Sequence, residues 1–159
     1  MHVSSALGTA AGTVTVSEGR TRLASATLHS GSATLTLPTR GVGRHTLTVS
    51  YSGDTAHAAA SRTLVLTVAR AASHTSLGLS VSSTHTATLT AHTTVVTPGR
   101  APVTGTVTFY DNGHRFATVR TTGTARVHHT LGHGKHTLTA RYSGSSLVSA
   151  SSGTRHDTV

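Results

Sequence analysis

Four histidines, the residue type most suited to holding a transition metal, lie within nine residues of one another: His128, His129, His133 and His136. Imidazole binds Zn²⁺ or Ni²⁺ well when three such ligands converge on the ion. Adjacent residues of a strand point to opposite faces, so His128 and His129 cannot both face one ion. Glycines flank His133 in a predicted turn, and no carboxylate lies nearby in the sequence to orient the rings. We therefore expect no specific metal site.

Acid–base or nucleophilic chemistry also lacks the residues that it needs. The four acidic residues are far apart in the sequence: Glu18, Asp54, Asp111 and Asp157. A calcium site takes several carboxylates, and a glycosidase takes a close pair of them. There is no Cys, which excludes a thiolate nucleophile, a disulfide and a cysteine zinc site, and no Gly-x-Ser-x-Gly segment is present. We predict that the chain is not an enzyme and needs no cofactor.

The charge balance, in contrast, is strongly basic. Twelve Arg and one Lys give a net charge of +9 with His neutral, and thirteen His would add positive charge below about pH 6.5. Such a surface attracts anionic polymers, including acidic polysaccharide. Arg115, Arg120 and Arg126 fall on what we take to be central strands of the second half, and form the candidate ligand-binding patch. The alternative is that they are ordinary solvent-facing residues, because basic residues are scattered along the chain without a run.

Two further classes of partner are not expected. Proteins that read single-stranded nucleic acid combine a basic groove with aromatic platforms. Four of the five aromatic residues fall in core register, which leaves Tyr110 alone, so we expect no specific nucleic-acid binding. No apolar stretch approaches the roughly 18 residues of a membrane helix, so we expect no membrane insertion.

An internal repeat determines the expected fold. Residues 12–24 read GTVTVSEGRTRLA and residues 105–117 read GTVTFYDNGHRFA, and a second pair, GRHTLTVSYSG and GKHTLTARYSG, begins at residues 43 and 134. The two pairs are separated by 93 and 91 residues, so we predict a duplicated module.

Both copies alternate apolar and polar residues with period two, which is typical of half-buried strands. Val14 and Val16 in the first copy correspond to Val107 and Phe109 in the second. Asn112-Gly113 between two alternating runs predicts a hairpin. The pattern indicates an all-β chain of two tandem immunoglobulin-like antiparallel β-sandwiches. Further inward-facing sets complete the predicted strands: Ala33, Leu35 and Leu37; Leu47, Val49 and Tyr51; Leu138, Ala140 and Tyr142.

The modules are expected over residues 1–70 and 74–159. The second begins with a strand pair, residues 75–82 and 85–92, for which the first has no equivalent, so we predict that the first lacks its opening strands and leaves apolar surface uncovered. The last strand of the first module, residues 63–68, is apolar, but its counterpart, residues 154–159, is polar and breaks the pattern. We infer a fragment of a longer array, or frayed end strands.

The segments GTVTFYDNG and GKHTLTARYSG, preceded by a Thr-rich strand pair, resemble the bacterial Ig-like repeats of group 3. The resemblance covers residues 74–152 well and 12–68 in part. It implies tandem modules of secreted or surface proteins. His45 and His136 stand where such repeats often carry the Tyr of a tyrosine corner, so the resemblance implies inward imidazoles whose N–H replaces the phenol hydrogen bond. Tyr51 and Tyr142 are expected to be structural.

We therefore expect a non-catalytic spacer, stalk or adhesive repeat of a larger bacterial protein, secreted or at the cell surface, whose partners are neighbouring Ig-like modules. The alternative is a module that binds anionic glycans or cell-wall polymers through its Arg/His-rich surface. A third hypothesis is that the incomplete first module pairs with another chain by strand addition. Residues 1–11 lack the charged and apolar regions of a signal peptide, so an export signal is expected upstream.

Overall fold

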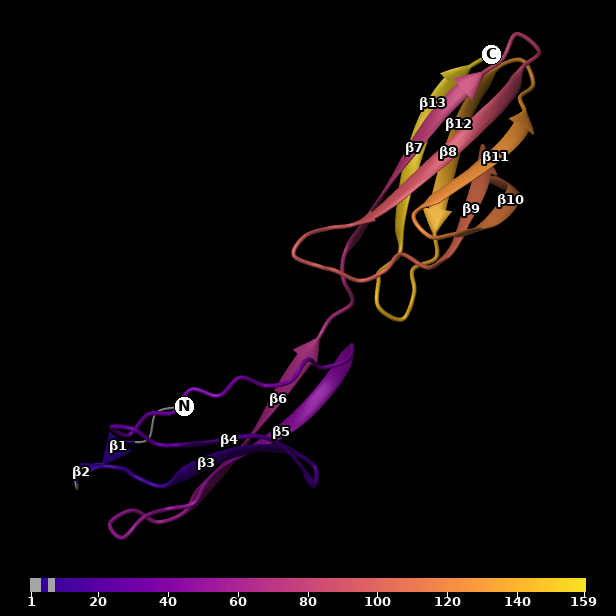
Figure 1. The fold of residues 1–159 in the computed structure, drawn as a ribbon. Coiled ribbons are helices and arrows are strands. Elements are labelled where there is room, and N and C mark those ends of the chain that lie inside the picture. The colour runs from indigo at the N-terminus through magenta and orange to yellow at the C-terminus, as the bar shows by residue number, and fades with distance from the viewer. Residues whose placement is uncertain (1–3, 6–7) are drawn as a thin grey trace. The chain divides into compact units, whose positions relative to one another are not determined.

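The computed structural model describes residues 4–5 and 8–159 and forms two compact units, Met1–Ala69 (unit 1) and Arg70–Val159 (unit 2) (Figure 1). Every regular element that it describes is a β-strand. Within the described residues, no helix is long and apolar enough to cross a membrane. The all-β prediction is confirmed.

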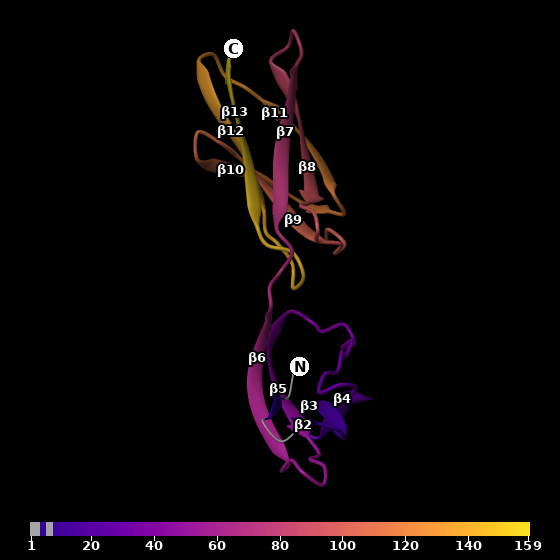
Figure 2. The ribbon, with the colours of Figure 1, turned by 90° about the vertical axis from the view of Figure 1, so that its left-hand side faces the viewer.

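Unit 2 is a two-layer sandwich of antiparallel strands (Figures 1 and 2). One sheet has the order β10-β9-β12-β13 and the other the order β11-β8-β7. The strands are β7 (Ser73–Val81), β8 (Thr86–Val95), β9 (Gly105–Asp111), β10 (His114–Thr121), β11 (Thr124–Thr130), β12 (Lys135–Tyr142) and β13 (Ser151–Thr158). This is the immunoglobulin-like arrangement that the alternation predicts.

Small aliphatic side chains from both sheets fill the interior of unit 2. Leu89 of one sheet and Val107, Phe109 and Leu138 of the other have no exposed surface. They belong to one apolar cluster, and alternate residues of the same strands carry mainly Thr outward. Removing such side chains from water contributes about 1.5–3 kcal/mol each for the larger ones.

The predicted hairpin is present between β9 and β10. Asp111 pairs with His114 across the two-residue turn, and Asn112 and Gly113 have φ angles of 46° and 83°. Two positive φ values are the signature of the turn that matches the twist of paired strands. The Asn112 side chain also accepts from the N–H of Thr137 and donates to the carbonyl of Lys135, which fixes the turn against β12.

Unit 1 repeats only one of these layers as a sheet. Its four-stranded sheet has the order β4-β3-β5-β6, and Val14 pairs with Tyr51 as Val107 pairs with Tyr142 in unit 2. The strands are β3 (Thr13–Glu18), β4 (Thr21–Thr27), β5 (Gly43–Tyr51) and β6 (Ala60–Val68), with β1 (Ser4–Ser5) and β2 (Gly8–Thr9) paired to each other ahead of them. No counterpart of β7 or β8 exists in the described part of unit 1, as expected for a module without its opening strands.

The segment of unit 1 that corresponds to β11 is not a strand, which corrects our prediction. Ala33, Leu35 and Leu37 keep the inward alternation, but residues 33–42 form no strand ladder. The physical reason is that the partner of β11 is β8, and the described part of unit 1 has no equivalent of β8. The inward face of β6 is consequently open, and Leu64 and Leu66 are 43% and 36% exposed.

The polar last strand of unit 2 is fully paired, so the alternative of a frayed end is wrong there. All eight residues of β13 pair with β12. Hydrogen bonds between hydroxyl groups, in place of apolar contacts, hold β13 against β7. The Ser151 hydroxyl lies 2.7 Å from the hydroxyls of both Ser73 and Thr75. Gly153 lets β7 pass closely, since an added Cβ would lie 2.5 Å from the Thr75 carbonyl oxygen.

The close approach of β7 and β13 at Gly153 makes the stability of unit 2 sensitive to a side chain at this position. Gly153→Ala should lower the free energy of unfolding of unit 2 by about 1–3 kcal/mol, because a methyl group must push two backbones apart. The register places Arg62 of unit 1 at the equivalent position, since Gly153 pairs with Ala140 as Arg62 pairs with Val49. Arg62→Ala should therefore have little effect. Urea unfolding followed by circular dichroism measures both, and equal losses would contradict the packing described.

Candidate functional site

The three arginines proposed as a patch do not lie on central strands. Arg115 and Arg120 are on β10, an edge strand of one sheet, and Arg126 is on β11, an edge strand of the other. Arg126 turns outward and its Nε donates to Thr90 Oγ1 at 3.3 Å. The structure thus keeps two of the three predicted residues on one sheet and separates the third from them.

The outer face of the β10-β9-β12-β13 sheet gathers other cations beside Arg115 and Arg120. Across this face Arg115 pairs with Tyr110, and Thr118, Thr108 and Arg141 form the next row. The Arg141 guanidinium lies 4.9 Å from the centre of the Tyr110 ring, a cation–π contact. We call the outward basic residues of this sheet the cationic face: Arg115, Arg120, Lys135, Arg141 and His156.

Sequence reasoning missed Arg141 although the signal was present. It stands between Ala140 and Tyr142, both predicted to point inward, so the same alternation assigns Arg141 to the outer face. What the sequence does not reveal is which outward residues become neighbours, because that depends on strand order and register.

Both acidic residues of unit 2 point away from the cationic face. Asp111 contacts the inward-facing His136, and Asp157 is the strand partner of His136, on the same inner side of the sheet. The positive charges of the outer face are therefore not neutralised by a carboxylate of unit 2. A single-sign surface of this kind raises the local concentration of anionic ligands.

His136 is held between two acceptors. Its Nδ1 lies 2.8 Å from Asp111 Oδ2, and its Nε2 lies 2.9 Å from the carbonyl oxygen of Gly132. Because both partners only accept, both ring nitrogens must donate, which favours the imidazolium. The Asp111 carboxylate, and after it the Gly132 carbonyl, raises the pKa of His136 above its ordinary value. The bond to Gly132, four residues upstream, is the one that a tyrosine corner makes.

The expectation that no carboxylate lies near the histidine cluster is wrong. Asp111, distant in sequence, contacts His136 and lies 3.4 Å from Nε2 of His129, whose ring stacks on Phe116. His128 points to the other face, where it meets Thr88. Within residues 8–159, no group of three or more His, Cys, Asp or Glu side chains is arranged to hold a metal ion.

Unit 1 repeats the histidine arrangement with different residues. His45 Nδ1 lies 2.8 Å from Glu18 Oε1, and Nε2 lies 2.9 Å from the Gly41 carbonyl oxygen. The carbonyl and then the carboxylate raise the pKa of His45. Arg40 adds a looser ion pair to Glu18 at 3.7 Å. In both units an inward imidazole joins the end of a hairpin to the glycine turn that precedes the histidine's own strand.

Tyr51 and Tyr142 tie the opposite ends of the same strands. Tyr142 is buried and its hydroxyl donates to the Thr104 carbonyl at 2.7 Å, and Tyr51 donates to the Ala11 carbonyl at 2.5 Å. Each bond joins the strand to the segment that enters the first strand of its sheet. A net contribution of about 0.5–1.5 kcal/mol is typical of such a bond.

The carboxylate of Asp54 is engaged in holding a turn. Oδ1 accepts from the backbone N–H groups of Ala56 and His57, and Oδ2 accepts from the N–H of Ala11 at 2.7 Å. The Ala11 bond is the largest cause of a strongly lowered pKa. Ser145 performs the same turn function in unit 2 by accepting from Leu147 and Val148. Asp54 and Ser145 thus stabilise equivalent turns in the two units.

The imidazolium bonds predict a pH-dependent stability. The pKa of His136 in the folded chain lies above the unfolded value of about 6.5. Its stabilising contribution is therefore complete below about pH 6.5 and disappears as the pH rises through the raised pKa. His136→Leu should cost most stability in mild acid and progressively less in alkali. Asp111→Asn, which removes the charged partner while keeping its size, should lose the same pH-dependent part of the free energy of unfolding.

Thermal or urea unfolding of the wild type and both variants between pH 5 and pH 9 measures this. A difference between wild type and variant that stays constant over that range would contradict the imidazolium assignment.

Comparison with protein-family models agrees with this architecture. The family model of the bacterial Ig-like domain (group 3) matches residues 1–69 and 74–159. Among solved structures, the fibronectin(III)-like modules of Clostridium thermocellum CbhA are similar at 14% identity and a TM-score of 0.43, over 96% of this chain and 80% of that one. No curated protein matches the chain. The chain belongs to the bacterial Ig-like domain family of group 3, whose model it matches in two successive segments.

Proposed function

We propose that the chain is a non-catalytic, extracellular pair of modules that serves as a spacer or adhesive repeat of a larger bacterial surface or secreted protein. The observation that carries this proposal is that carboxylate and imidazole side chains hold hairpins and turns in place. Asp54, Asp111 and Glu18 each accept from groups that fix a hairpin or a turn, and the two inward histidines complete those contacts. These carboxylates and imidazoles therefore have structural partners in the fold.

The outward strand residues also suit a module exposed to solvent. Thr108 and Thr118 lie 3.2 Å apart across strands, as do Thr15 and Ser25 in unit 1, and Thr139 pairs similarly with Thr154. Cross-strand hydroxyl pairs stabilise a sheet while keeping its face hydrated. Such a surface holds the fold without presenting a large apolar patch on the complete unit.

A second candidate function rests on the cationic face of unit 2. Arg115 and Arg120 project from β10 and Arg141 from β12, the two strands that flank β9, and Tyr110 of β9 lies beneath the Arg141 guanidinium. Arg120 also lines a hollow of about 490 Å³ whose other walls are glycine and threonine, among them Thr106 and Thr124. Guanidinium groups beside hydroxyls are suited to carboxylate, sulfate or phosphate groups of an anionic polymer. We therefore propose anionic cell-wall polymer or polysaccharide as the ligand class of this alternative.

Retention on immobilised heparin and on insoluble cell walls separates the two functions. A spacer should pass unretained at physiological salt. A binding module should be retained there, lose retention steeply as salt rises, and bind more tightly in mild acid as histidines become charged. Neither result depends on activity toward a substrate.

The triple variant Arg115→Gln, Arg120→Gln, Arg141→Gln locates any binding. It should elute from heparin at much lower salt than the wild type, because three charges of one face are lost. Arg126→Gln, on the other sheet of the same unit, serves as the control and should elute almost with the wild type. If Arg126→Gln lowers the eluting salt concentration by as much per charge removed as the triple variant does, retention depends on net charge alone and the cationic face is not a binding site.

A further inference from the structure

The last strand of unit 1 has one unpaired edge. β6 ends the sheet of order β4-β3-β5-β6, and among residues 4–5 and 8–159 no strand pairs with its other side. Three successive aliphatic side chains of β6 are exposed, with 43% for Leu64, 46% for Val65 and 36% for Leu66. A long, apolar, unpaired edge is a template on which another strand can add.

Unit 2 shows that this edge stays open even where the covering layer is complete. Its equivalent strand, β13, also ends a sheet, although β7 and β8 are present. The segment before β7 bonds instead to residues ahead of β13, since Ala71 bonds to Leu147 and Ser149. Strands equivalent to β7 and β8 would therefore leave the edge of β6 open in unit 1 as well.

The two edges differ in chemistry at equivalent positions. By the registers of β6 with β5 and of β13 with β12, residues 64–66 correspond to residues 155–157. Unit 2 carries Arg155, His156 and Asp157 where unit 1 carries Leu64, Val65 and Leu66. Charged side chains on an edge strand discourage pairing with another strand. Unit 2 thus has a protected edge, and unit 1 has an aliphatic edge in its place.

Alternate residues of β6 direct their backbone groups to the open edge. In unit 2, Val159 and Gly134 exchange both backbone hydrogen bonds. The equivalent pair in unit 1 is Val68 with Gly43. Bonded and non-bonded pairs alternate along an antiparallel ladder, so the even-numbered residues of β6 bond to β5. The N–H and carbonyl groups of its odd-numbered residues therefore point to the open edge.

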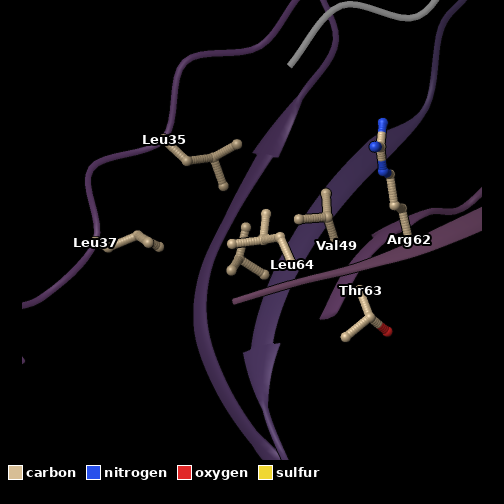
Figure 3. A pocket seen from close by; sticks show the side chains of 7 residues that line it. Leu35, Leu37, Val49, Arg62, Thr63 and Leu64 are labelled. Carbon is tan, nitrogen blue, oxygen red and sulfur yellow. The ribbon is translucent and has the colours of Figure 1, made fainter. Parts of the chain in front are cut away.

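The side chains of β6 divide between the two faces of the sheet. Leu64 projects on the inner side, toward an apolar hollow of about 650 Å³ that Leu35 and Leu37 also line. Thr63 projects from the opposite side of the strand (Figure 3). By the same alternation Val65 lies on the outer face with Thr63. The exposure of Val65 is therefore independent of what covers the inner face.

The sequence around Val65 is a palindrome, TLVLT over residues 63–67. An antiparallel pair of two β6 strands centred on Val65 would place this residue opposite the same residue of the second copy. Each leucine would then face a leucine, and each threonine a threonine. The single charged residue of β6, Arg62, would face Val68 and lie roughly 20 Å along the strand from the second Arg62. The edge is therefore complementary to itself, with no like charges opposed.

We propose that unit 1 forms a two-fold symmetric dimer with a second copy of this chain, by antiparallel pairing of the two β6 edges centred on Val65. The backbone groups of residues 63, 65 and 67 bond across the dimer axis. Such an isologous contact uses the same edge of both copies, so it closes at two. One strand per copy is a smaller contact than the roughly 1,200–2,000 Å² of stable complexes, so the dimer is weak and depends on concentration. It is independent of the cationic face of unit 2.

Sedimentation equilibrium of the full chain, from about 10 µM to about 1 mM, measures the dimer. The wild type should pass from monomer toward dimer over this range. Val65→Lys places two like charges opposite each other and should raise the dissociation constant about fivefold or more. His156→Lys makes the same change at the equivalent position of unit 2 and should leave the constant unchanged. Circular dichroism verifies that both variants are folded.

A mixture of Val65→Lys and Val65→Glu tests the two-fold register. The mixture should dimerise more tightly than either variant alone, because opposite charges then face each other on the axis. A mixture that dimerises no more tightly than the separate variants would show that residue 65 does not meet itself, and would contradict the proposed pairing.

Disulfide cross-linking reads the register without the charged variants and decides the question if these unfold. The chain has no Cys, so Val65→Cys and Thr63→Cys each carry one thiol. In the proposed pair the two Cα atoms at position 65 lie about 5.5 Å apart, within reach of a disulfide. Those at position 63 lie about 14 Å apart, beyond its reach. Val65→Cys should therefore cross-link much faster than Thr63→Cys under mild oxidation.

Three results would overturn the proposal. The first is a wild type that stays monomeric at every concentration. The second is a dimer that His156→Lys weakens as much as Val65→Lys does, because the contact then does not lie on unit 1. The third is equal cross-linking of Val65→Cys and Thr63→Cys, because the strands then do not pair about Val65.

Discussion

A sheet with one apolar face is stable in water only when a second layer covers that face, and this constraint governs both units. Unit 2 meets it completely, because the β11-β8-β7 sheet covers the larger sheet, and Ala87, Leu89 and Ala91 of its central strand β8 are fully buried. Unit 1 repeats the larger sheet in the same register but lacks the strands that cover it within its described residues. The irregular segment 33–42, the exposed Leu64 and Leu66, and an apolar hollow of about 650 Å³ beside Leu35 and Leu37 all follow from that one difference.

The two units also share a way of using charge. In each, an inward imidazole bridges a hairpin carboxylate and a glycine carbonyl, and a tyrosine hydroxyl at the other end of the same strand binds the entering segment. These contacts place Asp111 and Asp157 of unit 2 on the inner side of the larger sheet, away from the basic residues of the cationic face. The carboxylates of unit 2 therefore leave the charges of the cationic face unpaired, and the anionic ligand proposed for this face is inferred from charge alone.

Period-two alternation and the internal repeat predict most of the strands, the Asn112-Gly113 hairpin, and a first unit without counterparts of β7 and β8 among its described residues. They fail where a property depends on a partner strand. Residues 34–39 alternate correctly, yet a strand needs a neighbour to bond with. Arg126 and Arg115 lie on different sheets, because the chain changes sheets between β10 and β11. The contact of Asp111 with His136 is hidden in the sequence, because sequence distance does not reveal that β9 and β12 are neighbours.

Amide hydrogen exchange, resolved by residue, tests the central claim most directly. Residues 126–130 of β11 and residues 34–38 of unit 1 are equivalent by sequence, but among the described strands only β11 has a partner. The account predicts strong protection of alternate amides in 126–130 and exchange at nearly the rate of an unstructured peptide in 34–38. Comparable protection of the two segments in the isolated chain would show that the sheet of unit 1 is already covered, and would contradict the account.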